Sequence, residues 1–174
     1  DVFSAITHYD ASKCSTKGLR NGVLNKFYYL QVLYLDNNQI TMIDETTFDN
    51  CEAMEALYIR WNKIGFIHEK VFILAKSLEI LMLDGNQLTE IDFLDNFPKK
   101  SLRELSLSSN SLSNLRGNIF TRHKNLESIW LDLNKLTSIP PKLFDNLPKL
   151  TAVDLSNNFL ALSCLDVIEN SFLY

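Results

Sequence analysis

Apolar and polar residues alternate in short runs along this chain, and the runs return every 24 residues. Each unit of such an array contacts only its neighbours, so a fixed period of this length argues against a fold with one central core. Residues that share a role should therefore lie in columns that run across the repeats. Six runs follow the pattern L-x-x-L-x-L-x-x-N-x-L, and they begin at Leu30, Met54, Leu78, Leu102, Leu126 and Leu150.

Within each run the apolar residues occupy alternate positions, which predicts a short β-strand. In the first run Leu33 and Leu35 would point inward, while Tyr34 and Asp36 would point outward. No single repeat can bury its apolar residues alone, so each strand should pair in parallel with the equivalent strand one repeat away. A column of phenylalanines completes the expected core behind the strands: Phe48, Phe72, Phe120 and Phe144.

The phenylalanine column is interrupted at position 96, which is Asn. We expect Phe93 or Phe97 to fill the space through a shifted loop. Pro98 argues that no helix runs through this connection, because proline removes a backbone donor and clashes with the preceding turn. The surface behind the strands should be irregular there.

An asparagine follows every strand, where the chain should turn inward and leave backbone groups without ladder partners. An amide side chain can both donate hydrogen bonds to such groups and accept them. Cys14 takes this place in an earlier, weaker copy of the repeat, where a thiol would serve less well. We interpret the column as a structural asparagine ladder: Asn38, Asn62, Asn86, Asn110, Asn134 and Asn158.

The motif resembles that of the leucine-rich repeat family over residues 30–160. The resemblance implies an α/β-type solenoid: a right-handed horseshoe with a parallel β-sheet on its concave face and loops or short 3-10 turns on its convex face. We expect a single domain over residues 1–174. Its units would be a degenerate first repeat at 6–29, repeats at 30–53, 54–77, 78–101, 102–125 and 126–149, and a last repeat with a C-terminal cap at 150–174.

The 24-residue repeat with a phenylalanine column is similar to the typical extracellular class of the family, which includes Toll-like receptors and secreted immune proteins. The resemblance implies an extracellular, secreted protein that recognises a protein partner on its concave face, in innate immunity or as a receptor ectodomain. No Asn-x-Ser/Thr sequon occurs in the chain, and this absence weighs against secretion. The initial segment DVFSAITHYD is not a signal peptide, so a secreted form would have lost its signal.

Composition narrows the range of partners. The net charge is −4 and no run of Lys or Arg is present, so nucleic acid and anionic membranes are poor candidates. No segment approaches the roughly 20 consecutive apolar residues that a membrane span needs, so we expect no membrane insertion.

Three cysteines cannot all pair within one chain. Cys164 lies six repeats beyond Cys14, so these two cannot meet in a solenoid, and Cys51 lies at a different place in its coil. One interpretation is three free thiols. The other is an intermolecular disulfide from Cys164 to a second chain, or a bond to a missing segment.

The outward-facing strand residues form two apolar patches and an acidic rim. The first patch combines Tyr34, Tyr58, Trp61 and Met82, the second is Trp130 with Leu133, and the rim is Asp36, Asp84 and Asp132 around Arg60. Aromatic residues with an arginine have the composition of interaction hot spots. Tyr and Trp also favour strands and stack across them without any ligand. Our predicted partner-binding residues are Tyr34, Tyr58, Arg60, Trp61, Met82, Asp84, Trp130 and Asp132.

Catalytic and metal-binding patterns are missing from the sequence, and we expect neither an enzyme nor a cofactor. His8, His68 and His123 fall at three different places in the coil, and no zinc, phosphate-loop or nucleophile motif occurs. The three rim aspartates alternate repeats, which is too wide a spacing for one metal ion.

Two alternatives to concave-face recognition remain open. The solenoid ends would expose strand edges and core residues unless they were covered, so they could drive homo- or heterodimer assembly. The tail residues Leu162, Leu165, Ile168 and Phe172 have roughly helical spacing and could cover the last coil. The chain could also be a fragment of a larger receptor ectodomain.

Overall fold

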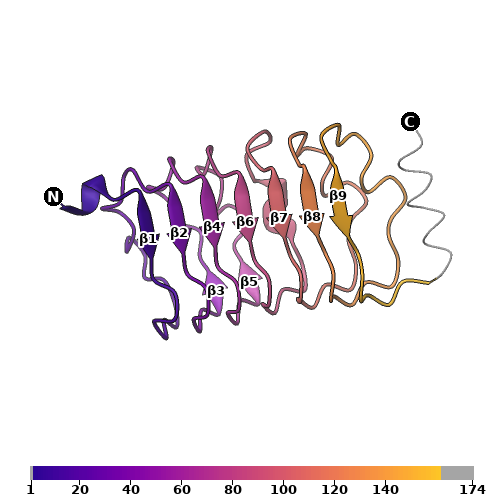
Figure 1. Ribbon diagram of the computed structural model, residues 1–174, viewed down its shortest axis with the longest axis horizontal. Helices are drawn as coiled ribbons and strands as arrows, with labels where there is room; N and C mark the ends of the chain where they lie inside the picture. The colour runs from indigo at the N-terminus through magenta and orange to yellow at the C-terminus, as the bar shows by residue number, and fades with distance from the viewer. Residues whose placement is uncertain (1, 162–174) are drawn as a thin grey trace.

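The computed structural model describes residues 2–161, which wind into a solenoid with a seven-stranded parallel sheet along one side (Figure 1). Each strand pairs with the equivalent strand of the next coil at an offset of 24 residues, as Tyr34 with Tyr58. The predicted repeat register and parallel sheet are therefore confirmed. The strands in spatial order are β1 (His8–Asp10), β2 (Val32–Tyr34), β4 (Ala56–Tyr58), β6 (Ile80–Met82), β7 (Glu104–Ser106), β8 (Ser128–Trp130) and β9 (Ala152–Asp154).

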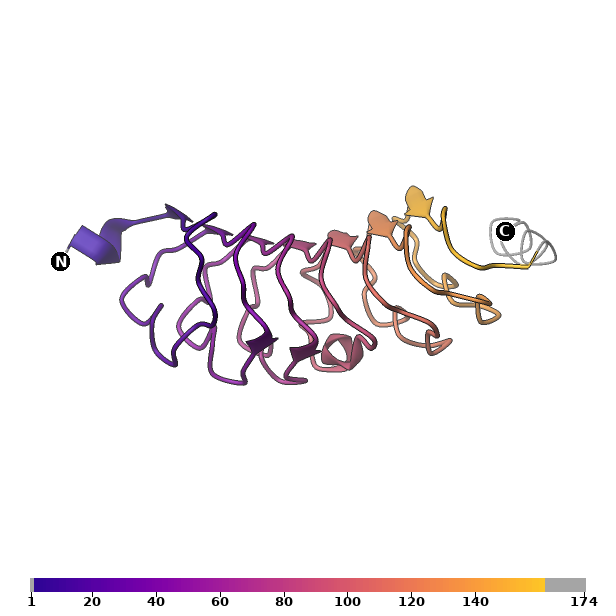
Figure 2. The same cartoon turned by 90° about the horizontal axis from the view of Figure 1, so that it is seen from below.

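The strands line the inner side of a shallow arc, and the loops return on the opposite side (Figure 2). Helical structure in the described residues is limited to two 3-10 turns, η1 (Val2–Ala5) and η2 (Asp92–Asp95). A second, two-stranded parallel sheet joins β3 (Met42–Ile43) to β5 (Phe66–Ile67). This small sheet was not predicted from the sequence.

The core is a continuous stack of buried columns. Leu33, Leu57 and Leu81 from successive strands are buried. Behind them the predicted phenylalanine column is present: the rings of Phe48 and Phe72 stack with centroids 5.6 Å apart, as the column requires. Each fully buried side chain of this size contributes roughly 1.5–3 kcal/mol relative to exposure, so the gross stabilisation comes from repetition.

The interruption at Asn96 is filled from both sides of the missing phenylalanine. Phe93 and Phe97 are both buried, with ring centroids 5.7 Å and 5.2 Å from that of Phe72. We expected only one of the two to fill the space. η2 carries Phe93 inward and ends before Pro98, so the proline interrupts no helix.

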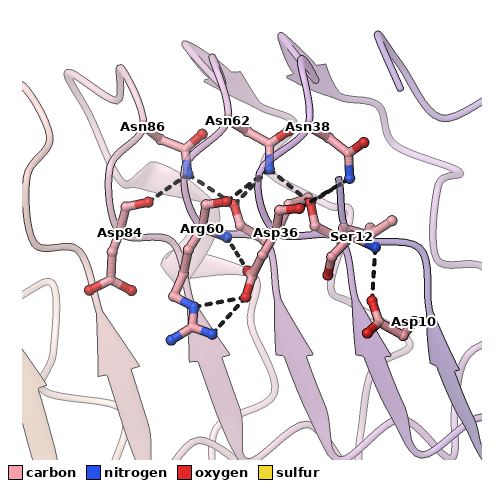
Figure 3. A network of polar contacts seen from close by, with 10 residues as sticks. Asp10, Ser12, Asp36, Asn38, Arg60, Asn62, Asp84 and Asn86 are labelled. Atoms are coloured by element: carbon pink, nitrogen blue, oxygen red, sulfur yellow. Dashed lines mark hydrogen bonds and ion pairs between the residues drawn. The ribbon is translucent and has the colours of Figure 1, made fainter. Parts of the chain in front are cut away.

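The asparagine ladder joins each coil to the coil before it. Asn86 Oδ1 accepts a hydrogen bond from the Ile64 backbone N–H at 3.0 Å. Its Nδ2 donates to the carbonyl oxygens of Ile59 at 3.1 Å and Leu83 at 2.9 Å. The same pattern recurs along the array, and Figure 3 shows three of its members side by side. The asparagine side chains thus pair backbone groups of their own coil and of the coil before it.

The first coil is tied into the array by the same device. Asn38 Oδ1 accepts hydrogen bonds from the backbone N–H groups of Cys14 at 3.0 Å and Thr16 at 2.9 Å. The Cys14 thiol instead donates to the Ser12 carbonyl oxygen at 3.4 Å. Both Cys14 and Cys51 are free thiols, while Cys164 and the proposed C-terminal cap lie outside the described residues.

Candidate binding face on the parallel sheet

Two stacked tyrosines lie at the centre of the first predicted patch. The rings of Tyr34 and Tyr58, on paired strands, have centroids 4.8 Å apart and an interplanar angle of 13°. Met82 is the next residue in the same column. Burial, and then the neighbouring Tyr34, raise the pKa of Tyr58, so its phenol stays neutral at physiological pH and keeps its donor. The structure thus brings three of the predicted site residues together.

Arg60 connects this aromatic column to the acidic row beside it. Its Nε and Nη2 donate to Asp36 Oδ2 at 3.0 Å and 2.6 Å, and its backbone N–H donates to Asp36 Oδ1 at 2.7 Å (Figure 3). The guanidinium carbon lies 5.3 Å from the centre of the Tyr58 ring, within the range of a cation–π contact. The hydrogen bond to Asp36 raises the pKa of Arg60.

The expected acidic rim differs from the observed one at Asp36. We expected this side chain to face solvent, but only 7% of the residue is exposed because Arg60 covers it. The Arg60 side chain keeps 39% of its own surface exposed. A partner that approaches this row would therefore meet the guanidinium before the carboxylate.

Trp61 is the most exposed aromatic residue of the sheet face, at 55%. Its φ of 54° is left-handed, a conformation that suits Gly and Asn and disfavours bulky residues. Leu133, two coils beyond Gly85 in the same row, repeats both properties, with 51% exposure and a φ of 54°. Both residues have an unfavourable backbone conformation, and their side chains are nevertheless largely exposed. The whole row is left-handed: Lys13, Asn37, Trp61, Gly85, Ser109, Leu133 and Asn157.

The remaining two aspartates of the rim are held by serine hydroxyls. Ser106 Oγ donates to Asp84, and Ser108 Oγ donates to Asp132. The other carboxylate oxygen of Asp84 is shielded and has no hydrogen-bond partner in the part of the chain that the structure describes. The serine contacts were not predicted, because only the strand register shows which serine faces which aspartate.

Trp130 lies apart from the first patch. It pairs with Ser106 and Asp154 in the strand register, so β7 separates it from Met82 on β6. Its exposed apolar neighbour is Leu133. The structure therefore retains two distinct patches, with Ser106 between them in the central column.

The sheet face carries no arrangement suited to metal or histidine chemistry in residues 2–161. Among them, no three His, Cys, Asp or Glu side chains come close enough to hold a metal ion. His123 is buried behind the strands, and burial lowers its pKa. His68 lies 3.8 Å from Glu45, away from β4 and β6. Within the same residues, no helix has the length and apolar character of a membrane span.

Comparisons with known proteins agree with this geometry. A family model described as "Leucine rich repeat" matches residues 29–88 and 100–160, which leaves out the irregular connection around η2. No curated protein matches the sequence. A leucine-rich repeat protein of Leptospira interrogans has a similar structure, with a TM-score of 0.74 and 23% identity over 84% of this chain.

An internalin of Listeria monocytogenes, InlF, is also similar in structure, with a TM-score of 0.65 and 25% identity over 78% of this chain. The matched regions span 36% of the Leptospira chain and 38% of the Listeria chain. Both neighbours are therefore much longer than the segment they share with this chain.

Proposed function

Because this chain belongs to the leucine-rich repeat family, we propose that its parallel sheet face binds a protein partner. One observation carries the proposal: the Tyr34–Tyr58 stack, capped by Arg60, lies next to the exposed indole of Trp61. Tyr, Trp and Arg are the residues that most often dominate binding energy at protein interfaces. Proteins of this family generally act as interaction scaffolds, and we propose no catalytic activity.

The face is suited to binding because it is already ordered. Arg60 is held by two side-chain hydrogen bonds to Asp36, and Tyr58 is held by its stack on Tyr34. Side chains that are fixed before binding lose less rotamer entropy when a partner docks, which typically saves about 0.5–1.5 kcal/mol each. A rigid platform of this kind favours a partner that adapts to it.

We propose an extracellular setting, in innate immunity or as part of a receptor ectodomain. The support is the resemblance of the 24-residue repeat with its phenylalanine column to the extracellular class. Digestion of intact source cells with an impermeant protease tests this setting. A surface-exposed chain would be cleaved while a cytosolic marker survives, and a chain protected until the cells are lysed would contradict the proposal unless it is recovered from the medium.

The binding proposal is tested by photo-crosslinking from inside and outside the face. A photoreactive phenylalanine derivative replaces Met82, which belongs to the patch, or Phe66, a more exposed position on β5 outside the seven-stranded sheet. Each protein is irradiated in extracellular fluid or extract from the source. We expect a discrete protein adduct from position 82 and none of the same mass from position 66.

A second variant links any adduct to the patch itself. Tyr58→Ala or Trp61→Ala, placed in the protein labelled at position 82, should abolish the adduct while the melting temperature stays nearly unchanged, because both rings are partly or largely exposed. An adduct that survives both substitutions, or that forms equally from position 66, would exclude this patch as the binding surface.

Assembly through the last described coil is a second candidate, supported by Phe159. The equivalent position of other repeats is polar, as in Gln87 and Lys135, yet Phe159 is 71% exposed. Light scattering over a range of concentrations tests this role. Association that Phe159→Gln removes would favour assembly, whereas a monomer at every concentration would reject it.

A further inference from the structure

The net charge of −4 conceals a strong separation of charge between the two sides of the solenoid. The seven strand segments, 7–13 and its equivalents at every 24th residue, carry nine carboxylates and three cationic side chains. Every other described part of the chain carries nine carboxylates and fourteen cationic side chains. The strand carboxylates are Asp10, Asp36, Glu55, Glu79, Asp84, Glu104, Glu127, Asp132 and Asp154, and the cations are Lys13, Arg60 and Arg103.

Two of the three cations on the sheet side are already paired. Arg60 is bonded to Asp36. Arg103 bridges Glu79 at 3.2 Å and Glu127 at 3.0 Å along the edge of the sheet. Lys13 alone then faces six carboxylates: Asp10, Glu55, Asp84, Glu104, Asp132 and Asp154. The binding face is therefore negative, and its field favours the approach of cationic groups.

The apolar anchors of the face lie among these carboxylates. Trp61 and Leu133 occupy the same left-handed row, three strands apart, or about 14 Å at the usual strand spacing. Gly85, whose backbone the Trp61 indole covers, and Ser109 lie between them in that row, so no third large side chain of the row separates the two anchors. Asp84 and Asp132 stand in the adjacent row. A segment laid across the strands would meet apolar contacts at both ends and carboxylates alongside.

We propose that the occupant of this face is a basic protein segment that crosses the strands, with apolar side chains on Trp61 and Leu133 and lysines or arginines beside the carboxylates. This inference rests on the proposed function and specifies its partner. Charge complementarity of this kind mainly raises the association rate and excludes wrong partners, while the apolar anchors supply the contact area. An acidic partner would bring like charges together on the same surface.

The test uses three labelled peptides of equal length and defined sequence. All carry a leucine and a tryptophan about three or four residues apart, which in an extended chain spans the two to three strand spacings between the Trp61 indole and Leu133. They differ only in their other side chains, which are lysine, glutamine or glutamate. Fluorescence anisotropy should show the lysine peptide binding at least about tenfold more tightly than the glutamine peptide at low salt, and no binding of the glutamate peptide. The preference should shrink at about 0.3 M salt, where surface charges are screened.

Matched charge variants test whether the carboxylates of the sheet side cause the preference for the lysine peptide. The double variant Glu55→Gln, Glu104→Gln removes two carboxylates from the sheet side, and Glu52→Gln, Glu69→Gln removes two exposed carboxylates from elsewhere. Both make the net charge less negative by the same two charges. We expect the first to weaken the lysine peptide roughly fivefold or more and the second to change it less than about twofold. Equal effects of the two variants would overturn the proposal.

The remaining outcomes separate this inference from the proposed function. If the glutamine or glutamate peptide binds as well as the lysine peptide and Trp61→Ala abolishes that binding, the face is a binding site for a different chemistry. If none of the three peptides binds, the proposal of a basic partner is also overturned. The crosslink from position 82 makes no assumption about charge, so it judges the proposed function independently.

Discussion

The indole ring of Trp61 lies over the backbone of Gly85, one coil further along the solenoid. A Cβ atom added to Gly85 would fall 2.1 Å from Cε3 of the ring. Gly85 also has a left-handed φ of 65°, so glycine is favoured there on two counts. The exposed tryptophan of the candidate site is thus positioned by a residue that has no side chain.

Gly85→Ala should therefore destabilise the fold and displace Trp61. We expect a loss of about 1–3 kcal/mol in urea unfolding, from the left-handed backbone and the steric conflict together. In the Trp61→Ala background the conflict disappears and the cost should fall toward the backbone contribution alone. Gly65→Ala is the control, because nothing lies within 4 Å of its added Cβ. Equal costs of Gly85→Ala in the two backgrounds would show that the two residues do not interact.

Asn86→Leu should be costly in the middle of the array. It leaves the Ile64 N–H without its acceptor and removes the donor shared by the Ile59 and Leu83 carbonyls. Because a buried unpaired polar group costs about 1–3 kcal/mol, the free energy of unfolding should fall by at least about 2 kcal/mol. Asn114→Leu is the control, because this side chain is exposed and donates to the hydroxyl of its neighbour Ser113 at 3.2 Å. A similar loss from both substitutions would reject a special role for the ladder.

The two arginines of the sheet side should respond differently to removal. Arg60→Ala removes both side-chain hydrogen bonds to Asp36 and uncovers that carboxylate, so we expect a loss of about 1 kcal/mol after allowing for the solvent that reaches both groups. Arg103→Ala should change the thermal melting temperature little, since Arg103, Glu79 and Glu127 are all substantially exposed. Calorimetry on both variants compares them directly. A larger effect at Arg103 would contradict this ranking.

His123 should make the fold sensitive to mild acid. Burial lowers the pKa of its imidazole in the folded chain, while its Nε2 donates to the Leu94 carbonyl oxygen at 3.2 Å. As the pH falls below the ordinary value near 6.5, the unfolded chain binds a proton that the folded chain does not, so the free energy of unfolding decreases. That loss continues until the pH reaches the lowered pKa of the folded state.

His123→Leu should flatten this pH dependence, because leucine carries no titrating group. Leu147 occupies the equivalent buried position one repeat later, and the Leu94 carbonyl keeps a backbone donor from Phe97. Urea unfolding at about pH 8 and about pH 5.5 brackets the ordinary histidine pKa. An unchanged pH slope in the variant would assign the acid sensitivity to other groups.

The two described cysteines should differ in reactivity. Cys14 is exposed, whereas Cys51 is buried and burial raises its pKa to about 11. In a Cys164→Ser background at about pH 8, iodoacetamide should modify Cys14 in the folded protein and Cys51 only in denaturant, because the thiolate is the reactive form. Peptide mass mapping identifies the labelled site. Labelling of Cys51 in the native protein would indicate that its coil opens readily.

The repeat register was predictable from the sequence because every coil restates it. Leu33, Asn38 and Phe48 each belong to columns that recur at fixed intervals, so one strand assignment fixed all the others. The strand pairing of Tyr34 with Tyr58 followed from the same arithmetic. The left-handed conformation of the row could not be predicted in this way. Trp61 and Leu133 are bulky residues, which rarely have positive φ.

Contacts between columns were the part that the sequence could not supply. The repeat register places Asp36, Arg60 and Asp84 in one row. It does not show which of the two aspartates pairs with Arg60, which is Asp36 in the structure. That choice depends on side-chain rotamers and on the backbone N–H of Arg60, which also donates to Asp36. The joint filling of the core by Phe93 and Phe97 likewise depends on η2, a local turn that no repeat elsewhere predicts.

Each asparagine of the ladder bonds backbone groups of the preceding coil, and this pattern determines how such an array can change in length. Excision of one interior block of 24 residues, such as 54–77, would bring Asn86 against the coil of Asn38, with the equivalent partners, the Ile40 N–H and the Leu35 carbonyl, at the new junction. Duplication of that block would do the same. Lengthening or shortening by whole units therefore keeps the hydrogen bonds of the ladder, and the length of the face can change by copying. The block around η2 is the exception, because Phe97 also packs against His123 of the following coil, and its loss would leave that imidazole beside a void.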